Sequence, residues 1–548
     1  GRIQSSDAVM KNKSTTMYGN IVALDESPLQ ENFLYVGTDD GLIQVSENQG
    51  ESWTEYGNFK GIPEHTYVNS LVASQHNVNR VYAVFNNHKK GDFNPYLMVS
   101  NDKGKTWKSI VSNLPKRGSV YDVVEDHKDE NLLFVGTEFG VYFTYNGGLE
   151  WKQLKNGLPT IAVRDLEIQK RENDLIVATF GRSFYVLDDY SALRNLEENI
   201  TAKAHIFPIK KSLMYIDSRP LGTRNKGSQG ESLFNAKNPP LGTIINYIFN
   251  DTLKTKKSLR QDLEKKKIKS NEDVEYPSIK QLKIEDREEK PYLIFTIYDE
   301  SGNEIRKIVE SAKVGFNSIV WNFRLTPQSN ISLKSSSPGR YGEAKNGPLA
   351  LPGKYFVTMH KIENGRATLM VDKTMFECEW LNQLSTPADD KKALLAFQLK
   401  VEKLRKAVDA SSEVLDEDKK RLSFIKSSFK SYPNLDLNYL TRLEDLNAKR
   451  DDIHIQLFGD PSLSKRDIEQ RESIASKVGI IIWNMWRSRS SPSSTNKMLY
   501  ESASMDFEKV IEQMQLLDDY LKEIEKYLES KEVPFTPGRG LILNWKKE

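Results

Sequence analysis

The stretch Ser100-Asn101-Asp102-Lys103-Gly104-Lys105-Thr106-Trp107 decides the fold, because close copies of it stand on either side in the first third of the chain. The earlier copy is Ser46-Glu47-Asn48-Gln49-Gly50-Glu51-Ser52-Trp53 and the later one is Thr144-Tyr145-Asn146-Gly147-Gly148-Leu149-Glu150-Trp151. A hydroxyl residue, an Asp or Asn, a glycine and a tryptophan keep the same spacing in every copy. Repetition at such an interval is typical of propellers and other arrays of one supersecondary unit.

The chemistry of this motif predicts a tight hairpin. An Asp or Asn side chain accepts hydrogen bonds from backbone N–H groups just ahead of it, and the glycine takes the left-handed conformation that the turn needs. Apolar residues alternate before the copies, as in Leu42-Ile43-Gln44-Val45 and Val141-Tyr142-Phe143. This alternation is typical of half-buried strands. We therefore expect each motif to join two strands, with the tryptophan at the start of the second one.

Residues 18–190 divide into four units that can be aligned beyond the motif itself. First strands are expected at residues 20–24, 69–73, 121–124 and 164–168, and second strands at residues 34–38, 81–85, 133–137 and 176–179. The second unit carries an insertion at residues 86–95, which we expect to stand over the mouth of the channel. The fourth unit has lost the glycine and the tryptophan, so we interpret it as a terminal blade.

The motif resembles the Asp box (BNR repeat), with Asn48 and Asn146 in place of the usual Asp. The repeats resemble the Asp-box β-propellers of sialidases, tandem-propeller xyloglucanases and sortilin-type receptors. The order of parts along the chain resembles the large bacterial sortilin-type proteins often labelled glycosyl hydrolases. This resemblance implies the C-terminal portion of a larger propeller, with upstream blades on the same or a companion chain. It also implies an extracytoplasmic location, which means periplasmic, cell-surface or secreted.

Later segments predict two further parts. Alternation in Tyr292-Leu293-Ile294-Phe295-Thr296-Ile297-Tyr298 and a turn at residues 299–303 indicate a small β-sandwich, which resembles the immunoglobulin-like domain of flagellar hook-capping proteins. The charged residues 254–290 are interpreted as a solvated loop, since acidic residues interrupt the basic ones. From Thr386 the apolar period becomes helical. Helices are expected at residues 386–414, 416–432, 437–458, 464–486 and 502–528.

The predicted fold class is therefore multidomain and mainly β. We expect Asp-box propeller blades over residues 1–202, an immunoglobulin-like β-sandwich over 203–380 with the charged insertion 254–290, an antiparallel α-helical bundle over 386–531, and a C-terminal extension over 532–548. A chain of 548 residues is expected to form several domains on size alone.

Composition excludes several classes of function. Lys plus Arg number 78 against 76 for Asp plus Glu, so no strong field favours nucleic acid as a partner. Cys378 is the single cysteine and the 7 histidines are scattered, so we expect neither a disulfide nor a metal site, and no cofactor. No apolar run approaches about eighteen residues, so we expect no transmembrane segment.

A ligand site is predicted on the face opposite the hairpins. In an antiparallel blade, the segment before the first strand and the turn after the second strand share one face. Polar side chains there can take a peptide, protein or glycan ligand by hydrogen bonding and stacking, although turns also favour Asn and Asp for local reasons. The predicted ligand-binding residues are Asn20, Asp40, Asn69, Asn86, Asn87, Tyr121, Arg164 and Arg182.

The alternative is a glycoside hydrolase, which leaves open whether the protein is an enzyme. Such an enzyme needs two carboxyl groups facing each other across a sugar at roughly 5 to 9.5 Å, one as the acid and the other as the base or nucleophile. The candidate carboxylates are Asp39, Asp122, Glu138 and Asp165. The sequence does not supply their separation, so binding and hydrolysis both stay open.

Overall fold

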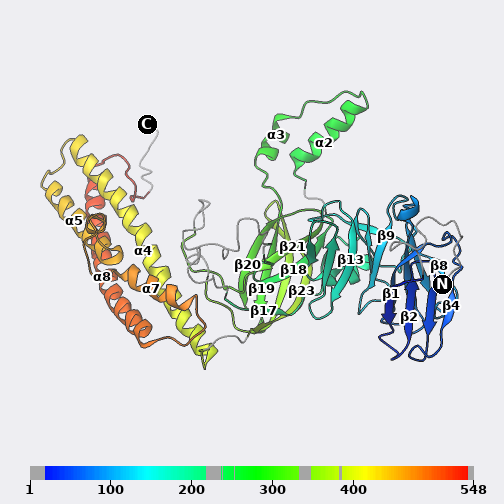
Figure 1. The fold of residues 1–548 in the computed structure, drawn as a ribbon. Coiled ribbons are helices and arrows are strands. Elements are labelled where there is room, and N and C mark those ends of the chain that lie inside the picture. The colour runs from blue at the N-terminus through cyan, green and yellow to red at the C-terminus, as the bar shows by residue number, and fades with distance from the viewer. Residues whose placement is uncertain are drawn as a thin grey trace.

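A computed structural model describes residues 19–216, 236, 238–251, 254–331, 347–381 and 386–540. Figure 1 shows three regions that follow one another along the chain: β-sheets, a second group of β-sheets, and helices. Most of the predicted extension 532–548 is covered as far as residue 540, and the first residues of the predicted propeller lie outside the described part.

The N-terminal region consists of antiparallel sheets that each use consecutive strands. The first sheet contains β1 (Ile21–Glu26), β2 (Leu34–Thr38), β3 (Ile43–Ser46) and β4 (Thr54–Tyr56). The second contains β5 (Tyr67–Ala73), β6 (Val81–Asn86), β7 (Tyr96–Ser100) and β8 (Lys108–Ser109), and the third contains β9 (Val120–Glu125), β10 (Leu133–Thr137), β11 (Gly140–Thr144) and β12 (Lys152–Leu154). In the described part of the chain, the fourth contains β13 (Val163–Gln169), β14 (Asp174–Thr179) and β15 (Phe184–Leu187).

These sheets are packed as propeller blades. The first strands β1, β5, β9 and β13 lie next to one another in chain order. Apolar clusters fill the space between consecutive sheets, so each sheet covers a face of the next one. Backbone N–H groups also donate from one first strand to its neighbour, as from Ala73 to Asp25 Oδ2 at 2.6 Å. The propeller-blade prediction, with the first strand innermost, is therefore confirmed.

The predicted hairpins have nearly the same hydrogen bonds in every copy. In the second copy, Ser100 Oγ accepts from Gly104 N at 2.9 Å and Asp102 Oδ1 accepts from Thr106 N at 2.8 Å. Gly104 has φ +84°, the left-handed conformation that the motif predicted. The third copy differs at its tryptophan: Trp151 Nε1 donates to Ile110 O, in the preceding blade, at 2.8 Å. This indole therefore ties neighbouring blades together.

The hairpins lie on the face opposite the predicted ligand site. Lys103 N, in a hairpin, donates to Asn79 O at 2.8 Å, and Asn79 belongs to the turn between β5 and β6. At the other end of the blades, Glu138 N donates to Ser119 O at 2.9 Å, which joins the turn after β10 to the segment before β9. The face assignment made from the sequence is confirmed.

The second region is a sandwich of two packed sheets. One sheet has the order β16 (Ala204–Ile206), β18 (Thr243–Phe249), β21 (Gly315–Trp321), and the other has the order β17 (Ser212–Met214), β23 (Arg366–Trp380), β22 (Gly353–Glu363), β19 (Tyr292–Asp299), β20 (Glu304–Ser311). Trp321 from the first sheet packs against Tyr355 and Phe376 from the second, with ring centroids 5.0 and 5.8 Å away. The sandwich is observed, and its immunoglobulin-like character stays a prediction.

The charged insertion is helical, so its interpretation as a loop was wrong. It contains α2 (Lys256–Lys269) and α3 (Ile279–Asp286), which stand out from the sandwich in Figure 1. Its Lys, Leu, Gln and Glu residues have high helix propensity. Arg260 joins the helices through Glu285, with Nη2 2.8 Å from Oε2. Neither helix has a buried residue, so the expected solvation is confirmed.

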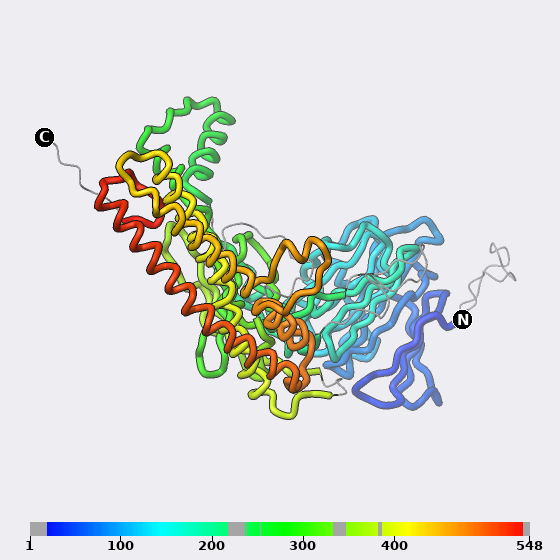
Figure 2. The backbone as a smooth tube through the Cα atoms, turned by 90° about the vertical axis from the view of Figure 1, so that its left-hand side faces the viewer, coloured from blue at the N-terminus to red at the C-terminus, as the bar shows by residue number. Residues whose placement is uncertain are grey.

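The third region is a helical bundle. Its helices are α4 (Lys391–Ser431), α5 (Tyr439–Phe458), α6 (Pro461–Ser464), α7 (Ile474–Met485) and α8 (Ser494–Ser530). The break expected near residue 415 was wrong: α4 runs through it, because Leu415 is fully buried in the bundle core and no Gly or Pro interrupts the helix. In both views α8 runs alongside α4 (Figure 2). Arg489 fastens the bundle to the sandwich by donating to Met214 O at 3.1 Å.

Glycine is required where β10, the second strand of the third blade, meets β13, the first strand of the fourth blade. A Cβ added at Gly136 would lie 2.9 Å from both Cγ1 and O of Val163. We expect Gly136→Ala to lower the free energy of unfolding of the blades by about 1–3 kcal/mol, because the backbone oxygen cannot move without displacing β13. Chemical denaturation and hydrogen exchange in β10 and β13 measure the effect.

Gly479→Ala is the matched control for this prediction. Gly479 lies inside α7, and nothing stands within 4 Å of an added Cβ. Alanine is expected to stabilise the helix there by roughly 0.5–1 kcal/mol. Equal effects of the two changes would contradict the packing argument.

Candidate ligand-binding site

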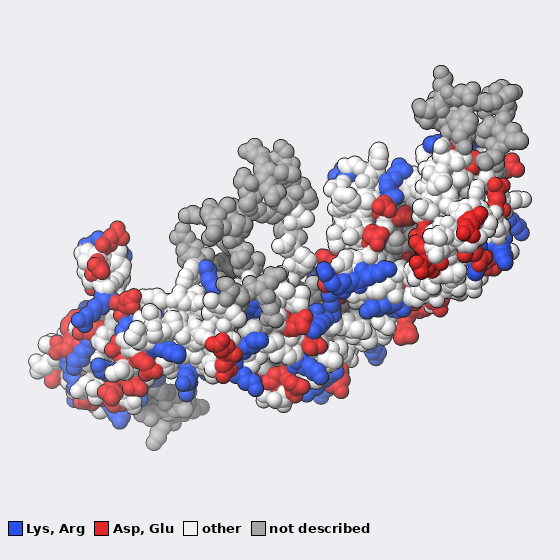
Figure 3. Space-filling model, turned by 60° about the horizontal axis from the view of Figure 1, so that its bottom comes forward, with Lys and Arg blue, Asp and Glu red and all other residues white. Residues whose placement is uncertain are grey.

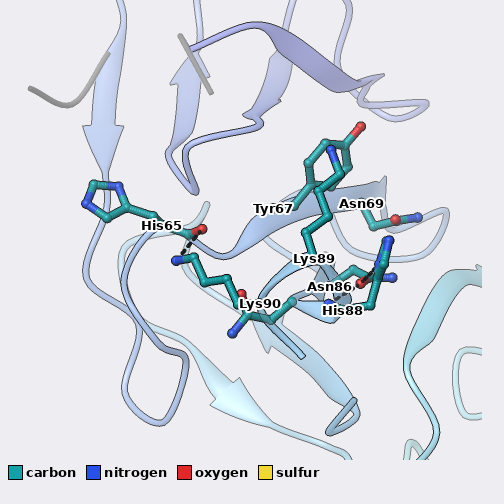
Figure 4. Close-up of a pocket in the computed structure, with 8 residues that line it drawn as sticks. His65, Tyr67, Asn69, Asn86, His88, Lys89 and Lys90 are labelled. Carbon is teal, nitrogen blue, oxygen red and sulfur yellow. Dashed lines mark hydrogen bonds between the residues drawn. The ribbon is translucent and has the colours of Figure 1, made fainter. Parts of the chain in front are cut away.

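A pocket opens on the predicted ligand face of the second blade. Its volume is about 190 Å³. Figure 4 shows Tyr67 and Lys89 side by side above Asn86 and His88, and Lys89 Nζ lies 5.3 Å from the centre of the Tyr67 ring. The lining side chains come from the segment before β5, from β5 and β6, and from the loop after β6, which contains η1 (His88–Lys90). They are His65, Tyr67, Asn69, Asn86, Asn87, His88, Lys89 and Lys90.

Asn86 is the most enclosed polar group of this pocket, with 3% of the residue exposed. Its Oδ1 accepts from the backbone N of His88 at 3.0 Å and also contacts His88 Nδ1. Its Nδ2 is buried and makes no close hydrogen bond among the described residues, and the Asn86 side chain lies near enough to the Tyr121 hydroxyl to act toward a lower pKa of that group. A buried N–H group left without an acceptor is costly, so Nδ2 is a natural donor for a bound ligand.

The site continues onto the third and fourth blades. Tyr121 donates its hydroxyl to Glu138. The Arg164 guanidinium lies over the Tyr121 ring at 3.8 Å and 5.3 Å from the Phe180 ring. Asn69 Nδ2 donates to Tyr121 O, which connects the pocket to this stack. We call Asn86, His88, Tyr121, Glu138 and Arg164 the mouth cluster.

The mouth cluster is rich in hydrogen-bond donors and contains one cation, Arg164, and one carboxylate, Glu138. Burial, helped by the nearby charges of Arg164 and Lys89, lowers the pKa of His88, while Glu138 acts in the opposite direction. His88 is therefore neutral at pH 7. Burial and the hydrogen bond to Glu138 raise the pKa of Tyr121, so its hydroxyl keeps its proton. The charges are one carboxylate, the stacked Arg164 and the neighbouring lysines.

Asp122 holds the inner strands together instead of facing an open pocket. Its Oδ1 accepts from Ser70 Oγ at 2.7 Å and its Oδ2 accepts from Leu166 N at 2.8 Å, so it joins the second, third and fourth blades. Burial raises the pKa of Asp122 to about 7, and nearby Asp165 adds to the rise. Asp122 thus carries a proton at mildly acidic pH.

The remaining predicted residues have other surroundings. Asp39 accepts from Gly19 N, Asn20 N and Asn20 Nδ2 at 2.8–3.0 Å, so Asp39 and Asn20 shape the start of β1. Asp40 accepts from Thr38 Oγ1 at 2.6 Å, and Asn87 donates to Asp92 at 3.0 Å within the loop. Asp165 and Arg182 are exposed. These contacts are local, unlike the links between blades in the mouth cluster.

Sequence reasoning missed several residues of the site. His65, Tyr67, His88, Lys89, Lys90 and Phe180 were not singled out. The insertion at residues 86–95 was the available signal, since it was expected to stand over the mouth, and η1 with its basic residues lies there. Phe180 had no signal of its own, because its role depends on Arg164 from a separate strand.

The described ranges contain no group of three or more His, Cys, Asp or Glu side chains suited to a metal ion. No helix of the described ranges combines the length and apolar character that crossing a bilayer requires. Figure 3 shows acidic and basic side chains interspersed over one face of the molecule, which agrees with the nearly balanced charge.

No protein-family model and no curated protein matches the chain. Solved structures with some similarity are β-propeller proteins. YCF48 from Cyanidioschyzon merolae is 18% identical over 31% of this chain and 53% of its own, with a TM-score of 0.25. The GH74 xyloglucanase from Xanthomonas campestris is 12% identical over 32% and 30%, with a TM-score of 0.25. An ancestral GH74 enzyme is 12% identical over 68% and 41%, with a TM-score of 0.26.

This chain therefore spans about half or less of the length of these structures. Similarity at TM-scores of this size carries no argument about the site or the activity. The strand order and the contacts between the blades carry the fold assignment.

The buried Asp122 predicts an unusual dependence of stability on pH. A free Asp has a pKa near about 3.9, so between about pH 4 and 7 the folded protein holds a proton that the unfolded chain releases. The free energy of unfolding therefore falls as pH rises through this window. We expect Asp122→Asn, which cannot ionise, to gain stability relative to the natural protein by on the order of 1–4 kcal/mol between pH 5 and pH 8.

Denaturation at both pH values, followed by tryptophan fluorescence, measures this difference. Glu150→Gln is the control, since Glu150 is exposed in its hairpin and the change removes a carboxyl group that is not buried. A difference between Asp122→Asn and the natural protein that stays constant with pH would contradict the elevated pKa.

Proposed function

We propose that this chain is a binding protein whose propeller takes a peptide, protein or glycan ligand at the mouth cluster. The observation that carries the proposal is the stack of Arg164 on Tyr121 and Phe180 beside the buried Nδ2 of Asn86. Stacking fixes the guanidinium plane and leaves its N–H groups to reach a ligand. A fixed cation and a buried donor are the groups that bind a carboxylate or a carbonyl oxygen.

The ligand is expected to present acceptor atoms together with an apolar or sugar face. Arg164 and Asn86 supply donors, and neutral His88 supplies either a donor or an acceptor. Tyr67 and Phe180 supply rings on which a side chain or a pyranose can stack. Side chains from separate blades meet here, so one ligand spanning the mouth would contact the second, third and fourth blades at once.

Arg164→Ala tests the proposal. The labelled protein is applied to an array of synthetic peptides and to a glycan array, and the strongest ligand is then titrated in solution. We expect the change to weaken binding by about tenfold or more, because truncating an anchor arginine typically costs more than about 1 kcal/mol.

Arg171→Ala is the matched control. Arg171 belongs to the same blade, but it lies in the turn between β13 and β14 on the hairpin face, and its side chain is 82% exposed. Binding that survives Arg164→Ala unchanged, or that Arg171→Ala weakens equally, would contradict a site at the mouth cluster.

A glycoside hydrolase is the second candidate, and one observation favours it. Asp122 has a pKa of about 7 through burial, and exposed Asp165 lies close enough to influence it. A protonated acid beside an ionised carboxylate is the pairing that glycosidases use. Against this role, Ser70 and Leu166 already occupy both Asp122 oxygens.

Hydrolysis assays on a panel of polysaccharides separate the two candidates. An enzyme of this kind is expected to lose about a hundredfold or more of its rate in both Asp122→Asn and Asp165→Asn, with Glu150→Gln as the unaffected control. Ligand binding that persists in both variants without any turnover supports the binding protein. Membership of the sortilin-type Asp-box proteins and an extracytoplasmic location belong to the same proposal and rest on the sequence resemblance alone.

A further inference from the structure

A larger cavity lies away from the mouth cluster, between the third and fourth blades and the adjoining end of the sandwich. Its volume is about 710 Å³, which is within the usual range for ligand pockets. Most of its lining is apolar. The side chains that matter here are Leu154, Leu158, Leu175, Val177, Tyr185 and Leu187.

The equivalent space between the second and third blades is filled by the side chain of Trp151. Residues 107–115 and 151–159 align one to one, so that Leu154 corresponds to Ile110 and Leu158 to Leu114. Trp151 packs against Ile110 and Leu114, is 3% exposed, and donates its indole N–H to Ile110 O at 2.8 Å. The cavity therefore has the same kind of wall as the site that holds Trp151 one blade earlier, and no side chain of the described residues fills it.

Among the described residues, no strand of the fourth blade takes the place that would carry this side chain. The third blade places Trp151 directly before its last strand, β12, whereas the fourth blade ends with β15. Within the described residues no strand pairs with the outer edge of β15. Three of its side chains reach solvent, with Phe184 71%, Val186 54% and Leu187 37% exposed. An open edge beside an apolar groove is suited to the addition of a strand.

We propose that an extended segment of another polypeptide adds a fourth strand to β15 and places an aromatic side chain in this cavity. Backbone hydrogen bonds to β15 would supply affinity, and the cavity would select the aromatic residue. This site lies apart from the mouth cluster and does not depend on the function proposed there.

The pattern of the partner follows from the chain's own fourth strands. These read Trp107-Lys108-Ser109-Ile110 and Trp151-Lys152-Gln153-Leu154, which is an aromatic residue, a lysine, a polar residue and an aliphatic one. The surroundings of the cavity suit the lysine. Asp188 and Asp189 line the cavity directly after β15. Burial and the nearby charges of Asp174 and Asp189 raise the pKa of Asp188, and the charge of Lys210 offsets only part of this rise. A basic side chain on the added strand would relieve this crowding of negative charge.

The cavity lacks one contact that the Trp151 site has, and this difference predicts reversible binding of the added strand. Asn113 holds the Trp151 backbone from both sides: its Oδ1 accepts from Trp151 N at 2.7 Å and its Nδ2 donates to Trp151 O at 3.0 Å. Gly157 occupies the corresponding position beside the cavity. Without this amide clamp the added strand is expected to bind reversibly.

The test uses a fluorescein-labelled peptide with the sequence of residues 149–156, Leu-Glu-Trp-Lys-Gln-Leu-Lys-Asn, titrated with the full chain and followed by anisotropy. We expect saturable binding, and binding weaker by about tenfold or more when alanine replaces the tryptophan of the peptide. Leu158→Trp, which fills the cavity from within, is expected to reduce binding by a similar factor. Ile331→Trp is the matched control, because Ile331 is 99% exposed.

The peptide change does not depend on whether a protein variant folds, and circular dichroism checks Leu158→Trp separately. N-acetyltryptophanamide in a parallel titration distinguishes a pocket for small aromatic molecules from a site for a strand. Absence of saturable peptide binding, equal binding of the alanine peptide, or equally tight binding of N-acetyltryptophanamide would each overturn the proposal.

Discussion

The close approach of neighbouring inner strands is the constraint on which the blades depend. Gly37 and Gly136 occupy equivalent positions in β2 and β10, where a side chain would collide with Val68 of β5 and Val163 of β13. Their small size lets the first and third blades lie against the first strand of the next blade. At this distance Asp25 reaches Ala73 N, and Asp122 reaches both Ser70 and Leu166. Packing and hydrogen bonding thus fix the same spacing between blades.

That spacing also determines the chemistry of the mouth. Arg164 stacks on Tyr121 because β13 lies beside β9, and Asn69 reaches Tyr121 because β5 lies on the other side. A cation held between aromatic rings loses little further conformational freedom when a ligand binds, so the rigid frame lowers the cost of recognition. Asp122, in contrast to Arg164, is buried between the inner strands. Burial favours the neutral form of its carboxyl group, and both of its oxygens link neighbouring strands by hydrogen bonds.

The repeated units differ from one another at the places where the molecule has a pocket or a cavity. In the third unit, which keeps its glycine and tryptophan, the hairpin closes and the Trp151 indole fills the space between this blade and the second one. In the fourth unit, which has lost both, the described residues leave a cavity of about 710 Å³ and a strand edge that no other strand of theirs covers. The second unit gained a loop instead, and its η1 residues shape the pocket at the mouth. Departures from the repeat therefore mark the places where the molecule presents recessed surfaces.

The sequence by itself determined the repeated hairpins, the order of sheets and helices, and the face on which the turns after the second strands gather, because hydrogen-bonding motifs and apolar periods are local properties. It did not determine that the charged insertion is helical or that α4 continues through residue 415, since helix propensity and burial of Leu415 outweighed the charge and the expected break. Only the tertiary structure decided which polar residues belong together. Tyr121, Glu138 and Arg164 meet with His88 and Phe180, whereas Asp39 turns to Asn20, because distances between blades depend on packing that no single segment encodes.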